Sequence, residues 1–307
     1  MDYIYLFAGL VGLFLGGEAL VRGSVGIAQR LAIPPLLIGL TVVGFGTSTP
    51  ELLVSVDAAL RGVPDIALGN VIGSNIANIL LIVGISALVW PIHVMRGTLA
   101  RDTGVMMAAA LVLVPVFAMG LVNRPVGAAL FIGLVAYLVW AYRQSRLDPS
   151  PVEEIAGVPA KLVLSILWVA GGLVALMLGA RFLVDGAVSI ARDFGLSEAF
   201  IGLTIVAIGT SLPELATSLI AALRKQSEIA IGNIVGSNIF NILGILGLTA
   251  VITPIPVAPR FLSFDLPILI AVSAILTGLL LLRPRIGRGI GLIFVLAYAL
   301  YIWAAQG

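Results

Sequence analysis

The fold of this chain is decided by a segment that occurs twice. GTSTPEL (46–52) and GNVIGSNIANI (69–79) return as GTSLPEL (209–215) and GNIVGSNIFNI (232–242). Residues 34–80 align with 197–243 without a gap at an offset of 163, and 27 of the 47 positions are identical. Each copy places a carboxylate, hydroxyls, amides and a proline within an otherwise apolar stretch. Such polar groups are costly in apolar surroundings, so we expect them to have a function.

Composition places the chain in a membrane. It is 60% hydrophobic and 10% charged, with a mean hydropathy of +1.17, whereas soluble domains carry about 25% charged residues. Several apolar runs reach the roughly 20 residues that span a bilayer as a helix, and continuous runs rather than alternation favour helices over a barrel. The first run lacks a basic segment and a cleavage site, so we interpret it as a retained helix. The absence of cysteine excludes disulfides and thiolate metal sites.

The apolar runs predict an all-α membrane fold of ten transmembrane helices. The repeat divides them into a first unit (1–143), a cytoplasmic linker (144–160) and a second unit (161–307). Because five is odd, the second unit must cross the membrane inverted relative to the first, as in many secondary transporters. We expect helices 2, 3, 7 and 8 to be broken. The predicted spans are 3–21, 36–60, 66–90, 104–122, 126–142, 162–180, 199–223, 229–252, 265–282 and 289–305.

The distribution of basic residues predicts the orientation. If the connection after the first helix is cytoplasmic, 12 of the 17 Lys and Arg residues fall on that side. The positive-inside rule then places both termini outside and the linker in the cytoplasm. This multi-pass protein is expected in the plasma or inner membrane of the cell.

The repeated strings gather oxygen ligands on helix faces. Pro50 and Pro213 each remove a helical hydrogen bond, and the freed carbonyls are tolerated only beside protein or a wet cavity. Residues three and four positions before each glutamate share its helix face. The candidate side-chain ligands are Thr47, Ser48, Glu51, Ser74 and Asn78 in the first unit, and Thr210, Ser211, Glu214, Ser237 and Asn241 in the second.

This ligand chemistry favours a hard cation. Carboxylate, hydroxyl and amide oxygens suit Ca2+, Mg2+ and Na+ and disfavour Zn2+ or Cu+. Inverted symmetry is expected to bring Glu51 and Glu214 together near the bilayer midplane. One divalent cation, two Na+ or two protons would neutralise the pair, so we expect these species to compete. Exchange follows if the empty, charged site is too costly to reorient.

Other polar residues carry weaker predictions. We expect the remaining repeated asparagines to bridge or cap broken helices, and the repeated glycines to allow close helix packing. Asp57 has no acidic counterpart and is assigned to a helix end or an access path, and His93 to the surface. The pairs Glu18–Arg22 and Arg181–Asp185 are interpreted as snorkelling residues at helix ends, with a gating ion pair as the alternative. Glycine-rich helices 1 and 6 are expected to slide against the site.

The paired strings resemble the α-repeats of the cation/Ca2+ exchanger superfamily, specifically the prokaryotic Na+/Ca2+ exchangers. The resemblance covers essentially all ten helices. It implies alternating access, Ca2+ extrusion driven by Na+ influx, and ion coordination by the ten side chains named above. It also implies that the backbone carbonyls of Gly44 and Ala207 serve Na+. Exchangers of this type often carry Asp where this chain has Asn241, which leaves the coupling ion and the stoichiometry open.

The resulting hypothesis is a Na+/Ca2+ antiporter with no cofactor and no catalytic residues. The alternative within the same site is exchange of Ca2+ or another cation for H+. An intramembrane hydrolase and a channel are the competing classes. No Ser–Lys, His–metal or paired intramembrane Asp motif supports a hydrolase, and the dependence of flux on a counter-ion separates a carrier from a channel. The expected partners are Ca2+, Na+ or H+ and the bilayer, without nucleic acid, and the oligomeric state is left open.

Overall fold

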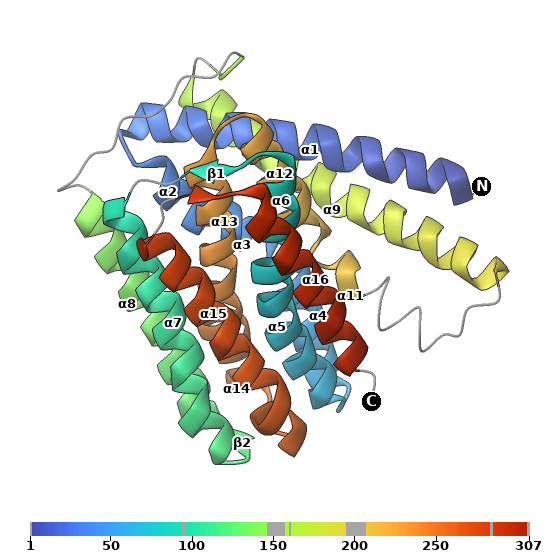
Figure 1. The fold of residues 1–307 in the computed structure, drawn as a ribbon, viewed down its shortest axis with the longest axis vertical. Helices are drawn as coiled ribbons and strands as arrows, with labels where there is room; N and C mark the ends of the chain where they lie inside the picture. Colours follow the sequence, from blue (N-terminus) through green and yellow to red (C-terminus); the bar gives the residue numbers. More distant parts are fainter. Residues whose placement is uncertain are drawn as a thin grey trace.

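The computed structural model describes residues 2–93, 96–145, 157–159, 161–194, 207–282 and 285–305, and these are almost entirely helical (Figure 1). In the first half the elements are α1 (Asp2–Leu31), α2 (Pro35–Ile38), η1 (Gly39–Val43), α3 (Gly44–Thr47), α4 (Thr49–Leu60), α5 (Pro64–Ala77), η2 (Asn78–Ile82), α6 (Val83–Val89), β1 (Ile92–His93), α7 (Arg96–Ala118), β2 (Leu121–Val122) and α8 (Arg124–Ser145). In the second half they are α9 (Leu162–Asp193), α11 (Ala207–Gly209), α12 (Leu212–Leu223), α13 (Ser227–Ile239), η4 (Phe240–Leu246), α14 (Gly247–Ile252), β3 (Ile255–Pro256), η5 (Phe261–Asp265), α15 (Leu266–Leu282), β4 (Arg285–Ile286) and α16 (Arg288–Ala305).

Membrane-type helices dominate the described part of the chain. Eight of them are long and apolar enough to cross a membrane, and a ninth span forms if the bent pair Pro35–Thr47 and Thr49–Leu60 is counted as one. The tenth predicted span, 199–223, lies partly outside the described residues, which show only α11 and α12 of it. The described helices therefore establish a polytopic membrane protein without by themselves giving a count of ten.

The first helix of each half is longer than the sequence predicted. The predicted spans 3–21 and 162–180 correspond to helices of 30 residues in α1 and 32 residues in α9. The prediction ended both helices at charged residues, because charges are expensive in lipid. In α1, however, Glu18 and Arg22 form an ion pair of 2.5 Å and both are largely covered by protein, which lets the helix continue.

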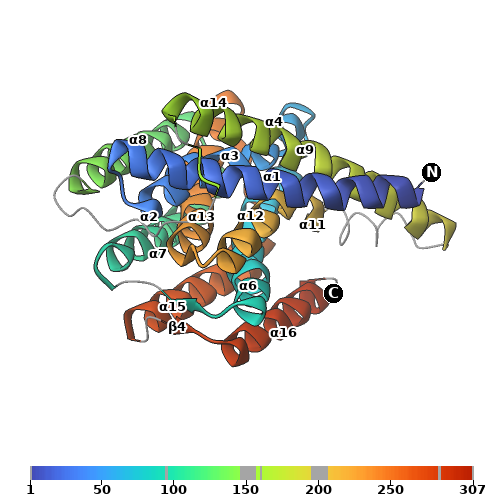
Figure 2. The same cartoon turned by 90° about the horizontal axis from the view of Figure 1, so that it is seen from above.

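Helices α1 and α9 lie side by side and cross the remaining helices at a steep angle (Figures 1 and 2). Their glycines form the contact. A Cβ placed on Gly16 would lie 2.7 Å from the Leu176 nitrogen, and one on Gly179 would lie 2.7 Å from the Leu13 nitrogen. Small residues allow such close backbone approach between membrane helices. The predicted glycine-rich pair is present, and its two members pack on each other.

Helices 2 and 3 and their counterparts are interrupted in two different ways. Helix 2 bends by 44° at Ser48, and its counterpart contains a turn at Thr210 and Ser211. Helices 3 and 8 were predicted to be broken, but they run continuously over Pro64–Val89 and Ser227–Ile252. Their interruptions are the π-helical turns η2 and η4. A proline forces the break in helix 2, whereas helices 3 and 8 contain no proline in these turns and absorb the change by widening, as π-bulges at functional sites often do.

Two short β-ribbons join the halves at opposite ends of the bundle (Figure 1). Strand β1 pairs with β4 and strand β2 pairs with β3, both antiparallel. Residues 92–93 of β1 and 255–256 of β3 are related by the repeat offset of 163, so the two ribbons are equivalent under the repeat. The same offset relates Gly62 (φ 76°) to Lys225 (φ 61°), which occupy equivalent turns with left-handed backbone. Repetition therefore extends beyond the strings to the connections.

Candidate cation site

The two repeated glutamates lie at matching helix starts. Ser48 (φ −83°, ψ 8°) ends α3, and Ser211 (φ −87°, ψ 5°) precedes α12 with nearly the same backbone. Glu51 and Glu214 then occupy the first turn of α4 and α12. Proline is favourable in the first turn because its missing N–H has no helical partner there, and a carboxylate at this end is stabilised by the helix dipole.

Crossed hydrogen bonds connect the two halves at these glutamates. The Ser48 hydroxyl donates to Glu214 Oε1 at 2.7 Å, and the Ser211 hydroxyl donates to Glu51 Oε1 at 3.4 Å. Each serine therefore serves the carboxylate of the other half. Both glutamates are 1% exposed, and the second carboxylate oxygen of each is buried without a hydrogen-bond partner among the described residues. Both carboxylates, each with one oxygen that has no described partner, thus lie within one buried region.

The backbone carbonyl of Gly44 lies within hydrogen-bond distance of two hydroxyls of the predicted site. The Gly44 carbonyl accepts from the Ser237 hydroxyl at 3.2 Å, and it lies 3.3 Å from the Thr47 hydroxyl. That Thr47 hydroxyl also lies 3.1 Å from Asn233 Oδ1. Predicted ligands from both halves therefore meet at Gly44. Ala207, its counterpart, lies on the three-residue helix α11, three positions before Thr210.

The repeated asparagines outside the predicted ligand set bind the protein itself. Asn70 Nδ2 donates to the Glu51 carbonyl at 2.9 Å and to Ser55 Oγ at 2.8 Å. Asn233 Nδ2 donates in the same way to the Glu214 carbonyl at 3.2 Å and to Ser218 Oγ at 2.8 Å. These are bridges between neighbouring helices, as the sequence predicted. The two serines were not predicted, although their separation equals the repeat offset and gave a signal.

The two amide ligands have different environments. Asn78 Nδ2 donates to Asn238 Oδ1 at 3.0 Å, which leaves Asn78 Oδ1 buried without a partner among the described residues. Asn241 is 1% exposed, and neither its oxygen nor its nitrogen has a partner within the described chain. Both amides are therefore buried with carbonyl oxygens available.

Ser74 and Thr210 line one cavity of about 510 Å3, together with Asn70. Asp65 also lines this cavity, at the end of helix 3 that the basic-residue distribution assigns to the outside. The cavity is thus lined both by predicted ligands and by a residue of the predicted outer surface. The counterparts Ser237, Thr47 and Asn233 are each at most 1% exposed.

A second pair of buried carboxylates was missed by the sequence analysis. Asp102 is fully buried, accepts two hydrogen bonds from Arg101 at 2.7 and 2.9 Å, and accepts one from Tyr137 at 3.1 Å. Asp265, at the repeat offset from Asp102, accepts from Tyr301 at 2.9 Å and pairs with Arg260 at 3.3 Å. The offset of 163 was the available signal. Each aspartate is thus a buried carboxylate with an arginine partner, and loss of that arginine would leave its charge uncompensated.

The remaining predicted residues lie near the surface. Asp57 pairs with Arg61 at 2.7 Å at an exposed helix end, and His93 lies in the exposed end of β1. Glu18 binds Arg22 and also forms an ion pair with Arg224, whose Nε lies 3.0 Å from Glu18 Oε2. That pair connects α1 to the residue that follows α12, so it is more than a snorkelling contact.

The fold and the site together define a class of protein. Membrane helices enclose two carboxylates, several hydroxyls and two amides in a buried region that belongs to both halves. Intramembrane ionisable groups of this kind mark ion pathways, and interrupted helices facing them are typical of secondary transporters. The geometry is that of a membrane protein that moves cations.

Comparison with known proteins gives the family. The sequence profile described as "Sodium/calcium exchanger protein" matches residues 1–143 and 164–306, so the chain belongs to the sodium/calcium exchanger family. It is 40% identical to the putative antiporter CaxA of Alkalimonas amylolytica over 93% of this chain and 90% of that protein. It is 32% identical to the sodium/calcium exchanger MaX1 of Methanosarcina acetivorans, over 98% of this chain and 97% of that protein.

A solved structure has the same fold. The sodium-calcium exchanger NCX_Mj, soaked with 10 mM Na+ and 10 mM Sr2+, superposes with a TM-score of 0.84 at 34% identity. The superposition covers 100% of this chain and 98% of that chain. The predicted recognition of the family is thereby confirmed, and the chain is a multi-span transporter of the cation-exchanging kind.

Proposed function

We propose that this protein is an antiporter that exchanges Na+ for Ca2+ across the membrane by alternating access. The observation that carries the proposal is the crossed pair of hydrogen bonds from Ser48 to Glu214 and from Ser211 to Glu51. Because each serine lies one turn from its own glutamate, the bonds bring both carboxylates into one buried region. Two buried carboxylates attract one divalent cation or an equivalent charge of monovalent ions.

The proposed architecture is ten transmembrane helices in two inverted five-helix repeats, 1–143 and 161–307, joined by a cytoplasmic linker at 144–160. The equivalent ribbons at opposite ends of the bundle support inversion, because one repeat places its ribbon at one end and the other repeat at the opposite end. The proposal places both termini outside.

The proposed ligands are the ten predicted side chains with the carbonyls of Gly44 and Ala207. The two free glutamate oxygens and the free Asn78 and Asn241 oxygens supply acceptors without breaking a described hydrogen bond. The Ser48, Ser211, Thr47 and Ser237 hydroxyls are held by carboxylate or carbonyl acceptors in the arrangement described here. Each hydroxyl keeps two lone pairs while it donates its proton, and one of them can be offered to a cation. Ca2+ takes six to eight oxygens, which this set provides.

Alternating access follows from the cost of the empty site. Without a cation, two ionised carboxylates would remain buried in an environment from which water is excluded, and this is strongly unfavourable. Occupation by Ca2+ or by Na+ removes the net charge of −2. The protein is therefore expected to reorient when loaded, which couples the flux of one ion to that of the other.

The coupling ion is tested by exchanging gradients. Purified protein in liposomes loaded with Na+ is expected to take up 45Ca2+ from a Na+-free medium. Liposomes of equal internal and external Na+ with an imposed pH gradient are the matched condition. Uptake that follows the Na+ gradient and not the pH gradient supports Na+/Ca2+ exchange, whereas uptake driven by pH alone assigns the protein to H+/Ca2+ exchange. Flux without any counter-ion would indicate a channel.

A further inference from the structure

The two amides of the candidate site are equivalent in the repeat but not in the structure. Asn78 is tied to Asn238 by a hydrogen bond of 3.0 Å from its Nδ2. Its oxygen therefore has a fixed direction and remains an open acceptor. Asn241 has no hydrogen-bond partner on either atom within the described chain. One difference between the two environments lies outside the repeated strings.

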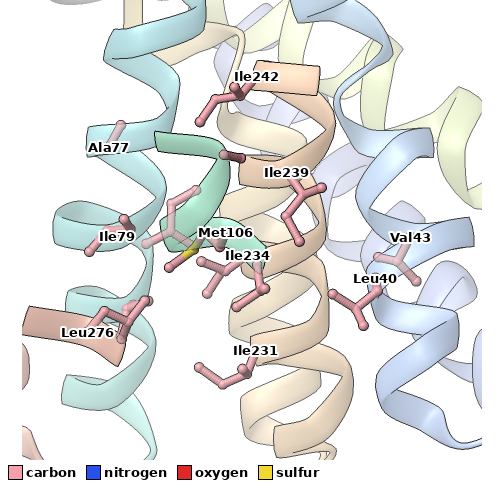
Figure 3. Close-up of a cluster of buried hydrophobic side chains, with 14 of the residues drawn as sticks. Leu40, Val43, Ala77, Ile79, Met106, Ile231, Ile234, Ile239, Ile242 and Leu276 are labelled. Carbon is pink, nitrogen blue, oxygen red and sulfur yellow. The ribbon is translucent and has the colours of Figure 1, made fainter. Parts of the chain in front are cut away.

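The difference leads to Met106 on α7. Asn238 accepts from Asn78 through its oxygen and donates its own Nδ2 to the Met106 sulfur at 3.6 Å. The oxygen and the nitrogen of a carboxamide are attached to the same carbon and lie in one plane, so an anchored donor fixes the direction of the acceptor. Met106 is 1% exposed and points between helices 3 and 8, close to Ile79 and Ile234 (Figure 3).

The second half has leucine at the position equivalent to Met106. Leu269 is equally buried, at 1% exposed, but its side chain has no acceptor. Asn75, the counterpart of Asn238, donates instead to the Val71 carbonyl of its own helix at 2.6 Å. Its oxygen is buried without a partner in the described residues. The sulfur acceptor is thus present in the first half, where the site amide Asn78 is hydrogen-bonded. It is missing from the second half, where the site amide Asn241 has no partner among the described residues.

We propose that Met106 is a positioning residue for cation binding. Through Asn238 it holds the Asn78 carboxamide with its oxygen directed away from the anchor, so that Asn78 is a preset ligand and Asn241 an adjustable one. The inference rests on the proposed function, in which both amides are ligands. A preset ligand lowers the ordering cost of binding, so Met106 acts on the affinity for Ca2+ more than on the maximal rate.

The test exchanges the two side chains between the halves. Met106→Leu removes the acceptor at nearly constant volume, a type of change that cores tolerate well. We expect it to raise the Ca2+ concentration for half-maximal 45Ca2+ uptake in proteoliposomes by roughly three- to tenfold, with little change in maximal rate. Leu269→Met is the matched control, which adds a sulfur to the other half and is not expected to raise that concentration.

A double-mutant cycle with Asn238→Ala separates positioning from packing. If Met106 acts through Asn238, Met106→Leu causes no further rise in half-saturating Ca2+ once Asn238 is alanine. An equal rise in both backgrounds, or a normal half-saturating Ca2+ in the single variant, overturns the inference. If Met106→Leu does not fold, Asn238→Ala alone must raise half-saturating Ca2+, and a normal value overturns the inference. Failure of wild-type protein to transport Ca2+ instead overturns the proposed function.

Discussion

The two halves offer nearly the same residues to the site, but helix 8 is packed more tightly around its residues than helix 3. In the first half, Asn70, Ser74 and Ala77 line a cavity of about 510 Å3. Their counterparts Asn233, Ser237 and Phe240 include two fully buried side chains and an aromatic ring that stacks on Phe45 with centroids 4.3 Å apart. A repeated sequence can therefore hold one side of a site open while the other is closed.

The glycines of the second string show the same contrast. A Cβ on Gly232 would lie 2.6 Å from the Leu36 carbonyl, whereas Gly69 and Gly73 line the cavity. The segment equivalent to the one packed on Gly232 lies outside the described residues. Predicted close packing thus holds for the glycines of the second half. Under the proposed alternating access, the two halves would exchange these packing arrangements during the cycle.

The largest expected effect concerns the feature that both halves share. Glu51→Gln and Glu214→Gln each remove one of the two charges, so that a single carboxylate is left to bind the cation. We expect Na+-gradient-driven 45Ca2+ uptake to fall by roughly a hundredfold or more in either variant, in line with the loss of a buried charge partner. Asp57→Asn, which changes an exposed carboxylate on the same helix, is the control. Near-normal uptake in either glutamine variant would remove that glutamate from the site.

An intermediate effect is expected from one matched pair of glycines. An alanine at 236 would overlap the Leu40 carbonyl, whereas Gly73 lines the cavity. Gly236→Ala is expected to lower the melting temperature in detergent by about 5 °C, as overpacking typically costs 1–3 kcal/mol. Gly73→Ala is expected to melt normally but to transport more slowly, because the first half must adopt the closed packing during the cycle. Equal stability of the two variants would contradict the packing difference.

The smallest effect is expected at an ion pair that forms at only one of two equivalent places. Arg224 binds Glu18 across helices, while its counterpart Arg61 binds Asp57 within one helix. Arg224→Gln should weaken the conformation described here by the 0.2–1 kcal/mol of an exposed pair, or about 1.4- to fivefold in population. The readout is the rate of maleimide labelling of Ala77→Cys on the cavity wall, in a chain that has no other cysteine.

Arg61→Gln is the matched control for this experiment and should leave the labelling rate unchanged. A fall in labelling with Arg224→Gln supports the gating role of the pair. The same rate in both variants would return Glu18 and Arg22 to the interpretation as residues that merely snorkel at a helix end.

The repetition made much of the molecule predictable. Apolar runs predicted the membrane helices, and the paired prolines correctly located the interruptions near Ser48 and Ser211. Helices 3 and 8 were less predictable, because a π-helical turn keeps the helix continuous and has no sequence marker comparable to proline. The lengths of α1 and α9 were underestimated, because the predicted spans stop just before Arg22 and Arg181, whereas each helix continues past its arginine, which pairs with a carboxylate four positions away.

The parts of the site that escaped prediction depend on contacts between halves. Nothing within either string shows that Ser48 binds the glutamate of the other string, since the bond joins residues 166 positions apart. Met106 escaped for a related reason: a methionine in an apolar helix looks like ordinary core until its sulfur is found next to Asn238. Asp102 and Asp265 were detectable through the repeat offset, but their arginine and tyrosine partners come from non-equivalent positions in the two halves.

The most direct test is to locate a bound cation. Crystals of the protein soaked with Ca2+ and measured near the calcium absorption edge would give its position from anomalous scattering. The account predicts a peak between the halves, with an oxygen of Glu51 and an oxygen of Glu214 both at the 2.3–2.6 Å typical of Ca2+ ligands. A calcium ion bound by one of these glutamates alone, or held elsewhere while both remain unliganded, would contradict it.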